Sequence, residues 1–481
     1  MRPTADELAS RCFKRAKPLA LSCALLGLIS QARALGADAT PTTPTLDSRV
    51  DAAVNAILTR TGMPSASIAL VRDSAIVYTQ AYGMAQLTPP RAATPTMRYA
   101  VGSISKEFTA TALLLLQESG KLSIDDPAGK WISGMGPAAN ASIRSLLSHT
   151  SGIRDFWPQD YDPPEMSRPI KPQEIVARWA NQPLDFATGT AWQYSNTGYT
   201  VAGIIAERAS HKPLFQFLEE RIFQPLKMTS VVDFNESPLP AEDAVGYMRY
   251  ALGPPRPAAK EGPGWMFAAG ELAMTASDLA RWDIALIQRQ VLDDASFRAL
   301  TTEVLLANGA GTGYGLGLDV ELKSGKRVLK HGGKVGGFTA ENRIYPDDGI
   351  AIVVLTNEDA TDASGTIADA TAEILFMGDS PSDAATITGA EDLFKHLQLG
   401  QVNTRRLTPN ARSYFTPQAL EDFHASLGPL GEPASFTLKR SAQRGGFATH
   451  VYEAAFPHQT LIVVVRSTAE GLIEQYTVST K

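Results

Sequence analysis

The most apolar helical pattern of the chain runs from Ile104 to Ser119 and predicts a buried helix. Its apolar residues lie on nearly every side of such a helix, not on one face. They are Phe108, Ala110, Ala112 and the run Leu113-Leu114-Leu115-Leu116. Gly120 marks the end of the pattern. We therefore expect this helix to lie inside a large domain.

Strand patterns stand on both sides of a long helical region. Two runs, 66–71 and 75–82, enclose a short turn and predict a hairpin. Residues 120–310 are mostly helical segments broken by proline-rich loops. Four more strand patterns follow, at 316–322, 327–330, 338–345 and 350–356, and then a helix at 363–376. The last strand is apolar throughout and predicts a central strand. This order predicts an α/β layer with a helical insertion and a cleft where the two meet.

The pattern also divides the chain into parts. Residues 46–378 form the large domain, and 379–390 are expected to be a linker. Residues 391–481 hold two helix patterns and four strand patterns, which predict a small α+β domain. Residues 35–45 are rich in threonine, proline and alanine and are expected to be a disordered lead-in.

Residues 1–34 have the layout of a secretory signal peptide. Four basic residues between positions 11 and 17 stand before the apolar run Leu19 to Ile29, and Ala32-Arg33-Ala34 provides a cleavage site. The run is too short to span a bilayer, so no stable membrane span is expected after cleavage; an uncleaved anchor is the alternative. Both cysteines, Cys12 and Cys23, lie in this segment. The mature chain is thus expected to be periplasmic or secreted and to have neither disulfide nor thiolate chemistry.

Charge argues against a nucleic-acid partner. Loss of residues 1–34 removes six basic and two acidic side chains and leaves 38 basic and 48 acidic ones, a net charge of −10. Nucleic-acid binding requires a basic face. The histidines show no metal-ligand spacing, so we expect neither a metal nor another cofactor. The expected partner is a small molecule or a short peptide, and the oligomeric state is left open.

Ser103 and Lys106 form a Ser-x-x-Lys motif at the start of the predicted core helix. Residues three apart lie on one face of a helix, so the two side chains are neighbours. Burial and the positive end of the helix dipole both lower the pKa of a lysine there. A neutral amine could then take a proton from the serine hydroxyl. The motif alone occurs by chance, so it requires further partners.

Two later stretches supply them. Tyr194-Ser195-Asn196 precedes a predicted helix, and His331-Gly332-Gly333-Lys334 ends a strand pattern. In this order the three motifs resemble those of class C β-lactamases and related penicillin-recognising serine hydrolases. The flanking sequences agree: residues 146–152 (LLSHTSG), 194–199 (YSNTGY) and 314–317 (YGLG). The resemblance covers residues 48–377. It implies a β-lactamase/transpeptidase-like fold, an antiparallel sheet flanked by helices with a helical subdomain.

The resemblance also implies roles. Ser103 would be the nucleophile and form an acyl-enzyme. Lys106 and the phenol of Tyr194 would share the proton transfers, with the lysine keeping the tyrosine partly ionic; which is the acylation base stays open. The backbone N–H groups of Ser103 and Lys334 would form an oxyanion hole. Asn196 would hold Lys106 or the substrate amide, or only cap the helix that follows.

The strand motif carries the substrate argument. Gly333 lets a substrate lie close to the strand, and His331 stands where true class C enzymes have lysine. A mostly neutral imidazole binds a β-lactam carboxylate weakly, and mild acid should strengthen that binding. We therefore expect a serine hydrolase acting on an ester or a small amide. A D-amino-acid peptidase acting on peptidoglycan fragments is the alternative among enzymes, and a non-catalytic cell-wall-peptide-binding module is the alternative outside them. His149 is expected to be a structural loop residue.

Overall fold

The computed structural model describes residues 45–159, 161–323, 325–377, 381–444, 447–468 and 471–481. The predicted signal peptide and nearly all of the predicted lead-in lie outside these residues. Within the described part of the chain, no helix is long and apolar enough to cross a membrane.

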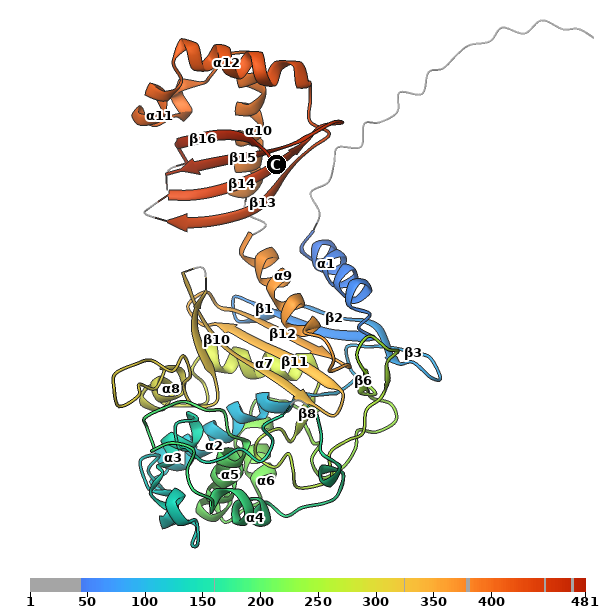
Figure 1. Ribbon diagram of the computed structural model, residues 1–481, viewed down its shortest axis with the longest axis vertical. Coiled ribbons are helices and arrows are strands. Elements are labelled where there is room, and N and C mark those ends of the chain that lie inside the picture. The colour runs from blue at the N-terminus through green and yellow to red at the C-terminus, as the bar shows by residue number, and fades with distance from the viewer. Residues whose placement is uncertain (1–44, 160, 324, 378–380, 445–446, 469–470) are drawn as a thin grey trace, which may run out of the picture. The chain divides into compact units, whose positions relative to one another are not determined.

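A seven-stranded antiparallel sheet forms the centre of the larger part (Figure 1). Its order is β3-β2-β1-β12-β11-β10-β9, so strands from the two ends of the domain pair side by side at β1 and β12. The predicted hairpin and the central position of β12 are confirmed, and every residue of β12 is buried. The strands are β1 Ser65–Arg72, β2 Ala75–Gln86, β3 Arg91–Ala92, β9 Asp319–Lys323, β10 Lys326–Val335, β11 Phe338–Tyr345 and β12 Ile350–Thr356.

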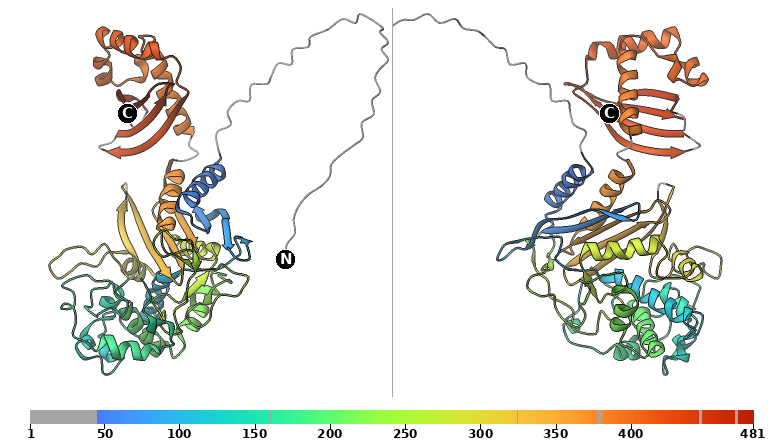
Figure 2. Two further views of the ribbon diagram at one scale, coloured as in Figure 1. Left: turned by 45° about the vertical axis from the view of Figure 1, so that its right-hand side comes forward. Right: turned by 180° about the vertical axis from the view of Figure 1, so that it is seen from behind.

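Helices cover both faces of this sheet, because strands such as β12 are apolar on both (Figure 2). Ile352 and Val354 face a core shared with α1 (Leu46–Thr61) and α9 (Ala363–Met377). Val353 and Leu355 face the larger core, which includes α2 (Ser105–Glu118) and α7 (Ala276–Ile287). The predicted buried helix is confirmed, since Leu113 to Leu116 are at most 4% exposed.

The helical insertion lies between β3 and β9 in the chain. Its remaining helices are α3 Ile143–Leu147, α4 Pro172–Ile175, α5 Asn196–Ser210, α6 Leu214–Leu218 and α8 Asp294–Thr301. Two small sheets join it: β4 Tyr99–Ala100, β8 Leu272–Met274 and β5 Val232–Asp233 form one, and β6 Tyr247–Met248 with β7 Arg256–Pro257 forms the other.

The C-terminal part is a small α+β unit, as predicted. Its four strands pair in sequence order as one antiparallel sheet with its own apolar core. The elements are α10 Pro381–Gln398, α11 Pro409–Tyr414, α12 Pro417–Leu427, β13 Ser435–Arg444, β14 Phe447–Ala455, β15 Thr460–Ser467 and β16 Ile473–Thr480.

The expected linker at 379–390 differs from the structure, in which helix α10 occupies the chain from Pro381 onward. A proline is compatible with the first position of a helix because the N–H that it lacks has no intrahelical acceptor there. The residues that follow are mostly alanine, threonine and other residues that a helix tolerates.

Truncation after Gly378 is expected to leave a soluble and active larger domain. Among the described residues, the two cores of that domain draw on Val50 to Leu375, and the C-terminal core draws on Ala390 to Tyr476. No core residue is shared, which is typical of domains that fold separately. Size-exclusion chromatography of residues 35–378 measures this. Aggregation where the full chain is soluble would show that the two parts depend on one core.

Candidate active site

A cavity of about 590 Å³ lies where the start of α2, the start of α5 and strand β10 meet. Six of the seven residues proposed from the sequence line it: Ser103, Tyr194, Asn196, His331, Gly333 and Lys334. The seventh, Lys106, is fully buried beneath it and reaches Ser103 through its amine. The structure therefore brings together all of the residues that the three motifs supply.

Ser103 lies in a 3₁₀ turn, Gly102–Ile104, that leads directly into α2. The turn is fixed to the neighbouring strand β8, because the Val101 N–H donates to the Leu272 carbonyl (3.0 Å) and the Leu272 N–H donates to Ser105 Oγ (3.0 Å). The serine is half-buried at the cavity floor.

The amine of Lys106 has three oxygen neighbours. Its Nζ lies 3.0 Å from Ser103 Oγ, 2.8 Å from Asn196 Oδ1 and 2.6 Å from the Ala269 carbonyl oxygen. The last two can only accept hydrogen bonds, so a neutral amine gives both of its N–H groups to them. Its lone pair is then directed at the Ser103 hydroxyl.

Burial lowers the pKa of Lys106 to about 7, and the charge of Asp155 opposes this only partly. The amine is therefore neutral in a large fraction of molecules at neutral pH, as its place in a core helix predicts. Its position and its protonation state both suit removal of a proton from Ser103.

Tyr194 differs from the sequence-based expectation of a partly ionic phenol. Burial raises its pKa well above the usual value, and a hydrogen bond with Ser103 lowers it only in part. The ring centroid lies 4.8 Å from Lys106 Nζ, but a lysine that is itself largely neutral gives an anionic phenolate little stabilisation. At neutral pH, Tyr194 is thus a proton donor, and Lys106 is the available base.

Asn196 is held by a residue that the motifs did not reveal, Asp155. The carboxylate accepts from the Asn196 backbone N–H (2.8 Å) and from its side-chain Nδ2 (3.1 Å), which directs Oδ1 at Lys106. Asn196 is not the cap of α5, because Ser195 Oγ accepts from the Gly198 N–H and takes that role. The sequence signal for Asp155 is weak, since it lies 41 residues from its partner in a proline-rich loop.

Two glycines bring β10 against the turn that carries Ser103. A Cβ on Gly333 would lie 1.9 Å from the Val101 carbonyl oxygen, and a Cβ on Gly102 would lie 2.8 Å from the backbone nitrogen of Lys334. The close approach at Gly333 is therefore to Val101, whereas the sequence suggested approach by a substrate. Because the strand and the turn approach closely, the backbone N–H groups of Ser103 and Lys334 lie near each other beside the cavity.

His331 is buried, and its hydrogen bonds fix its tautomer. Nδ1 lies 2.6 Å from the Gly332 carbonyl, which can only accept, so Nδ1 carries the proton. Nε2 then accepts from the Tyr314 hydroxyl (2.9 Å). Burial and the nearby charge of Lys106 lower the pKa of His331 to about 3. The expectation that mild acid charges this imidazole is therefore wrong.

The charged side chains of the cavity lining are mostly acidic. Asp155, Glu341, Asp359 and Asp362 line it, whereas the cationic side chain of its lining is Lys334, which is exposed. Glu341 is oriented by Arg343, whose Nε lies 2.7 Å from its carboxylate. No group of three or more potential ligand side chains in the described part of the chain could hold a metal ion.

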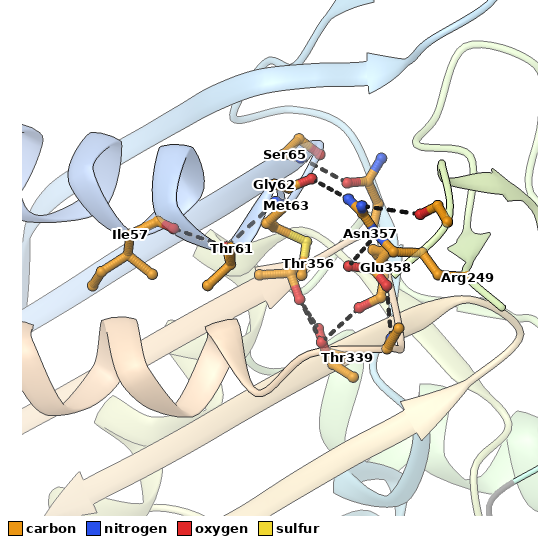
Figure 3. A network of polar contacts seen from close by, with 12 residues as sticks. Ile57, Thr61, Gly62, Met63, Ser65, Arg249, Thr339, Thr356, Asn357 and Glu358 are labelled. Carbon is orange, nitrogen blue, oxygen red and sulfur yellow. Dashed lines mark hydrogen bonds and ion pairs between the residues drawn. The ribbon is translucent and has the colours of Figure 1, made fainter. Parts of the chain in front are cut away.

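A polar network secures the wall of the cavity after β12 (Figure 3). Asn357 Oδ1 accepts from the Ser65 N–H (2.8 Å). The neighbouring Glu358 lies 3.5 Å from Arg249 Nε, and its carbonyl accepts from Thr339 Oγ1 (3.0 Å). These contacts fix the backbone that leads to Asp359.

Comparisons with known proteins agree with this arrangement. The family model described as Beta-lactamase matches residues 50–375. The chain is 30% identical over 320 residues to penicillin-binding protein 4* of Bacillus subtilis (strain 168), covering 63% of this chain and 70% of that protein. It is 27% identical over 298 residues to the D-aminopeptidase of Brucella anthropi, covering 61% of this chain but only 56% of that enzyme.

A solved structure shares the fold. The D-stereospecific amidohydrolase from Streptomyces sp. superposes with a TM-score of 0.59 at 29% identity, covering 67% of this chain and 98% of that one.

Proposed function

This chain belongs to the Beta-lactamase family of serine hydrolases, and within that family we propose that it forms an acyl-enzyme through Ser103 and hydrolyses an ester or a small amide. The observation that carries the proposal is the placement of the Lys106 amine among Ser103 Oγ, Asn196 Oδ1 and the Ala269 carbonyl. That placement gives the serine a base with a pKa suited to neutral pH.

The chemistry follows from these positions. Lys106 takes the proton of the Ser103 hydroxyl as Oγ bonds to the substrate carbonyl carbon, and the carbonyl oxygen becomes an oxyanion between the N–H groups of Ser103 and Lys334. The bond to the leaving group then breaks, and Lys106 returns the proton to it, with the neutral Tyr194 phenol beside them. Water attacks the ester carbonyl by the same route and restores the serine.

The charges of the cavity favour substrates without a carboxylate beside the scissile bond. His331 is neutral, and the cavity is lined by four acidic side chains and by one lysine, the exposed Lys334. A β-lactam carries such a carboxylate, so we propose that cephalosporins are hydrolysed slowly. The acidic lining also suits an amino group, which supports a D-amino-acid peptidase as the second candidate, in agreement with the named activity of one relative.

A substrate panel tests the proposal. Short-chain nitrophenyl esters and a D-alanine anilide are expected to be hydrolysed faster than a chromogenic cephalosporin. A fluorophosphonate probe should label wild type but not Ser103→Ala. Absence of labelling would favour a non-catalytic binding module, and faster turnover of the cephalosporin would contradict the assignment of the substrate class.

Mild acid is expected to leave substrate preference unchanged. Because the pKa of His331 is about 3, the imidazole stays neutral from pH 7 to pH 5. Protonation of Lys106 slows hydrolysis of all substrates by the same factor, so it does not change the ratio of kcat/KM for two substrates. The ratio of kcat/KM for the cephalosporin to that for the nitrophenyl ester should therefore change by less than about threefold over this range. A steep rise in that ratio toward pH 5 would mean either that the histidine gains its charge or that an acidic side chain of the lining, such as Asp359, whose pKa is raised by burial, loses its charge.

The mature protein is proposed to be periplasmic or secreted, on the basis of the sequence of residues 1–34. Mass spectrometry of protein from the native host should find an N-terminus near Leu35. Retention of residues 1–34 would identify them as an anchor.

A further inference from the structure

His149 is a buried histidine whose backbone adopts the left-handed conformation. It is fully buried and has a φ of 59°, in the left-handed region that residues other than glycine adopt in only a few per cent of cases, with asparagine, aspartate and histidine the most frequent among them. The sequence placed it in a loop with no role in chemistry. A strained and buried polar residue beside a reaction centre is a candidate for function.

The histidine contacts the segment that carries Tyr194 at two points. Its carbonyl accepts from the Gln193 N–H (3.0 Å), and its ring Nδ1 accepts from the Ser195 N–H (3.1 Å). Asp155 holds the next residue, accepting from the Asn196 N–H at 2.8 Å. The chain on both sides of Tyr194 is thus fixed by one loop, and the imidazole supplies the acceptor for the residue that follows Tyr194.

The ring of His149 also forms a wall for the phenol. Its centroid lies 4.2 Å from that of Tyr194, with 35° between the planes, and 4.8 Å from that of Tyr314. Tyr314 in turn hydrogen-bonds His331. The imidazole therefore lies between two side chains whose hydroxyl groups belong to the candidate active site.

We infer that His149 is a positioning residue, which sets the phenol of Tyr194 against Ser103 and the amide of Asn196 against Lys106. It acts through the Ser195 N–H and through its ring contact, and it touches no substrate. The inference rests on the proposed acyl-enzyme function, because it concerns the geometry of that site.

The hydrogen bond requires one protonation state. An Nδ1 that accepts from a backbone N–H carries no proton, so the proton of the neutral ring is on Nε2. Nε2 is buried and has no hydrogen-bond partner among the described residues, so only the Nδ1 bond and the ring contacts hold the imidazole. Burial, and the charge of Lys106 when that amine is protonated, lower the pKa of His149 well below its usual value and keep the ring neutral; His331, which also faces it, is itself uncharged.

Two substitutions separate the hydrogen bond from the ring. In His149→Asn, the side-chain Oδ1 occupies the place of Nδ1, and asparagine tolerates the left-handed backbone. In His149→Phe, the ring remains but the acceptor is lost. We expect kcat of His149→Phe to fall about 100-fold with KM changed less than about threefold, because a small displacement of reacting groups costs this much. His149→Asn should retain kcat within about tenfold.

His211 provides a matched control. It has the same φ of 59° but is exposed at the C-terminal end of α5, away from the cavity. His211→Phe imposes the same backbone strain and is expected to leave kcat unchanged. Equal losses of kcat in His149→Phe and His211→Phe, or equal kcat in the two His149 variants, would overturn the inference.

A measurement on wild type avoids any folding defect of the variants. A long-range ¹H–¹⁵N spectrum of histidine-labelled protein should show His149 as the Nε2–H tautomer, unchanged from pH 5 to pH 8. An Nδ1–H tautomer would also overturn the inference. Fluorophosphonate labelling of wild type identifies the source of a failure: a labelled Ser103 with normal kcat in His149→Phe refutes only the role of His149, whereas an unlabelled wild type refutes the proposed function as well.

Discussion

Lys106→Met is expected to abolish hydrolysis, with kcat/KM reduced by at least about 10³-fold, within the range for loss of a catalytic base. The substitution keeps an unbranched side chain of similar length and removes only the amine. Ser103 then has no base within hydrogen-bonding distance, because burial raises the pKa of the neighbouring Tyr194 well above neutral. Rates with the nitrophenyl ester, measured to the background of spontaneous hydrolysis, provide the test.

The free energy of unfolding of the same variant should lie within about 2 kcal/mol of that of wild type, because two opposing effects nearly cancel, so its inactivity will not reflect unfolding. In wild type, the unfolded chain binds a proton with a pKa near 10.5, and the folded protein binds it with a pKa of about 7. Proton binding by this lysine therefore stabilises the unfolded state relative to the folded state below pH 10.5. At pH 7 it lowers the free energy of unfolding by about 4 kcal/mol. Methionine removes that cost, but it leaves Asn196 Oδ1 and the Ala269 carbonyl without their donor. Each unsatisfied acceptor lowers the free energy of unfolding by about 1–3 kcal/mol.

Lys121→Met is the matched control, because it removes an equal charge from an exposed site after α2. It should leave both kcat and stability unchanged. Retention of more than about a tenth of wild-type kcat/KM in Lys106→Met would contradict the role of the amine as base.

The pH dependence of wild type provides a related expectation. Because the amine must be unprotonated to act, kcat/KM should fall as pH decreases through about 7, the pKa of buried Lys106. A profile that is flat from pH 8 to pH 5 would exclude Lys106 as the base.

Several helices and strands of the large domain could be predicted because they depend on the local pattern of apolar residues. The bounds of β11 and β12 match the predicted segments, and those of α2 agree to within one residue. In α2 and β12 a continuous apolar run of helix or strand length marks an element that is buried on all sides. The three motifs likewise predicted which side chains meet, since each motif is a fixed local geometry presented by one of these elements.

Electrostatic detail was not predictable in the same way. Motif spacing predicts which residues are neighbours but not how deeply they are buried. Burial keeps Tyr194 protonated and His331 uncharged, and Tyr314, which hydrogen-bonds His331, lies outside the three motifs. The Ala269 carbonyl that accepts from Lys106 is a backbone group. Every residue has one, so the sequence gives no sign of this contact. Asp155 and His149 act across distances of about 40 residues, where no periodicity connects them to their partners.

The helix at 381–398 shows another limit of composition. A proline and several small polar residues favoured a linker there, but a helix accommodates a proline at its first position. Local composition did not distinguish an exposed connection from the first turns of the helix that begins the next domain.

Gly333→Ala is expected to reduce kcat/KM by about 10²–10³-fold, the effect of losing one donor of an oxyanion hole. The added Cβ would lie 1.9 Å from the Val101 carbonyl oxygen and 3.3 Å from the Ser103 nitrogen. Both are backbone atoms, so no side chain can rotate away, and β10 must move from the turn that carries the nucleophile. The Lys334 N–H, on the next residue of the strand, moves with it.

Gly332→Ala is the control that makes this interpretation specific. It lies one residue earlier on the same strand, but its Cβ would meet only the Glu341 carboxylate, at 3.4 Å, and the Ala340 carbonyl, at 3.8 Å, both ordinary contacts. It should retain kcat/KM within about tenfold, because the strand keeps its distance from Ser103. The loss in Gly333→Ala should appear in kcat with esters and amides alike, since the oxyanion is common to both, and fluorophosphonate labelling of Ser103 should slow in parallel. If both alanine variants lost activity equally, flexibility of β10 would be the cause; if neither did, the Lys334 N–H would not stabilise the oxyanion.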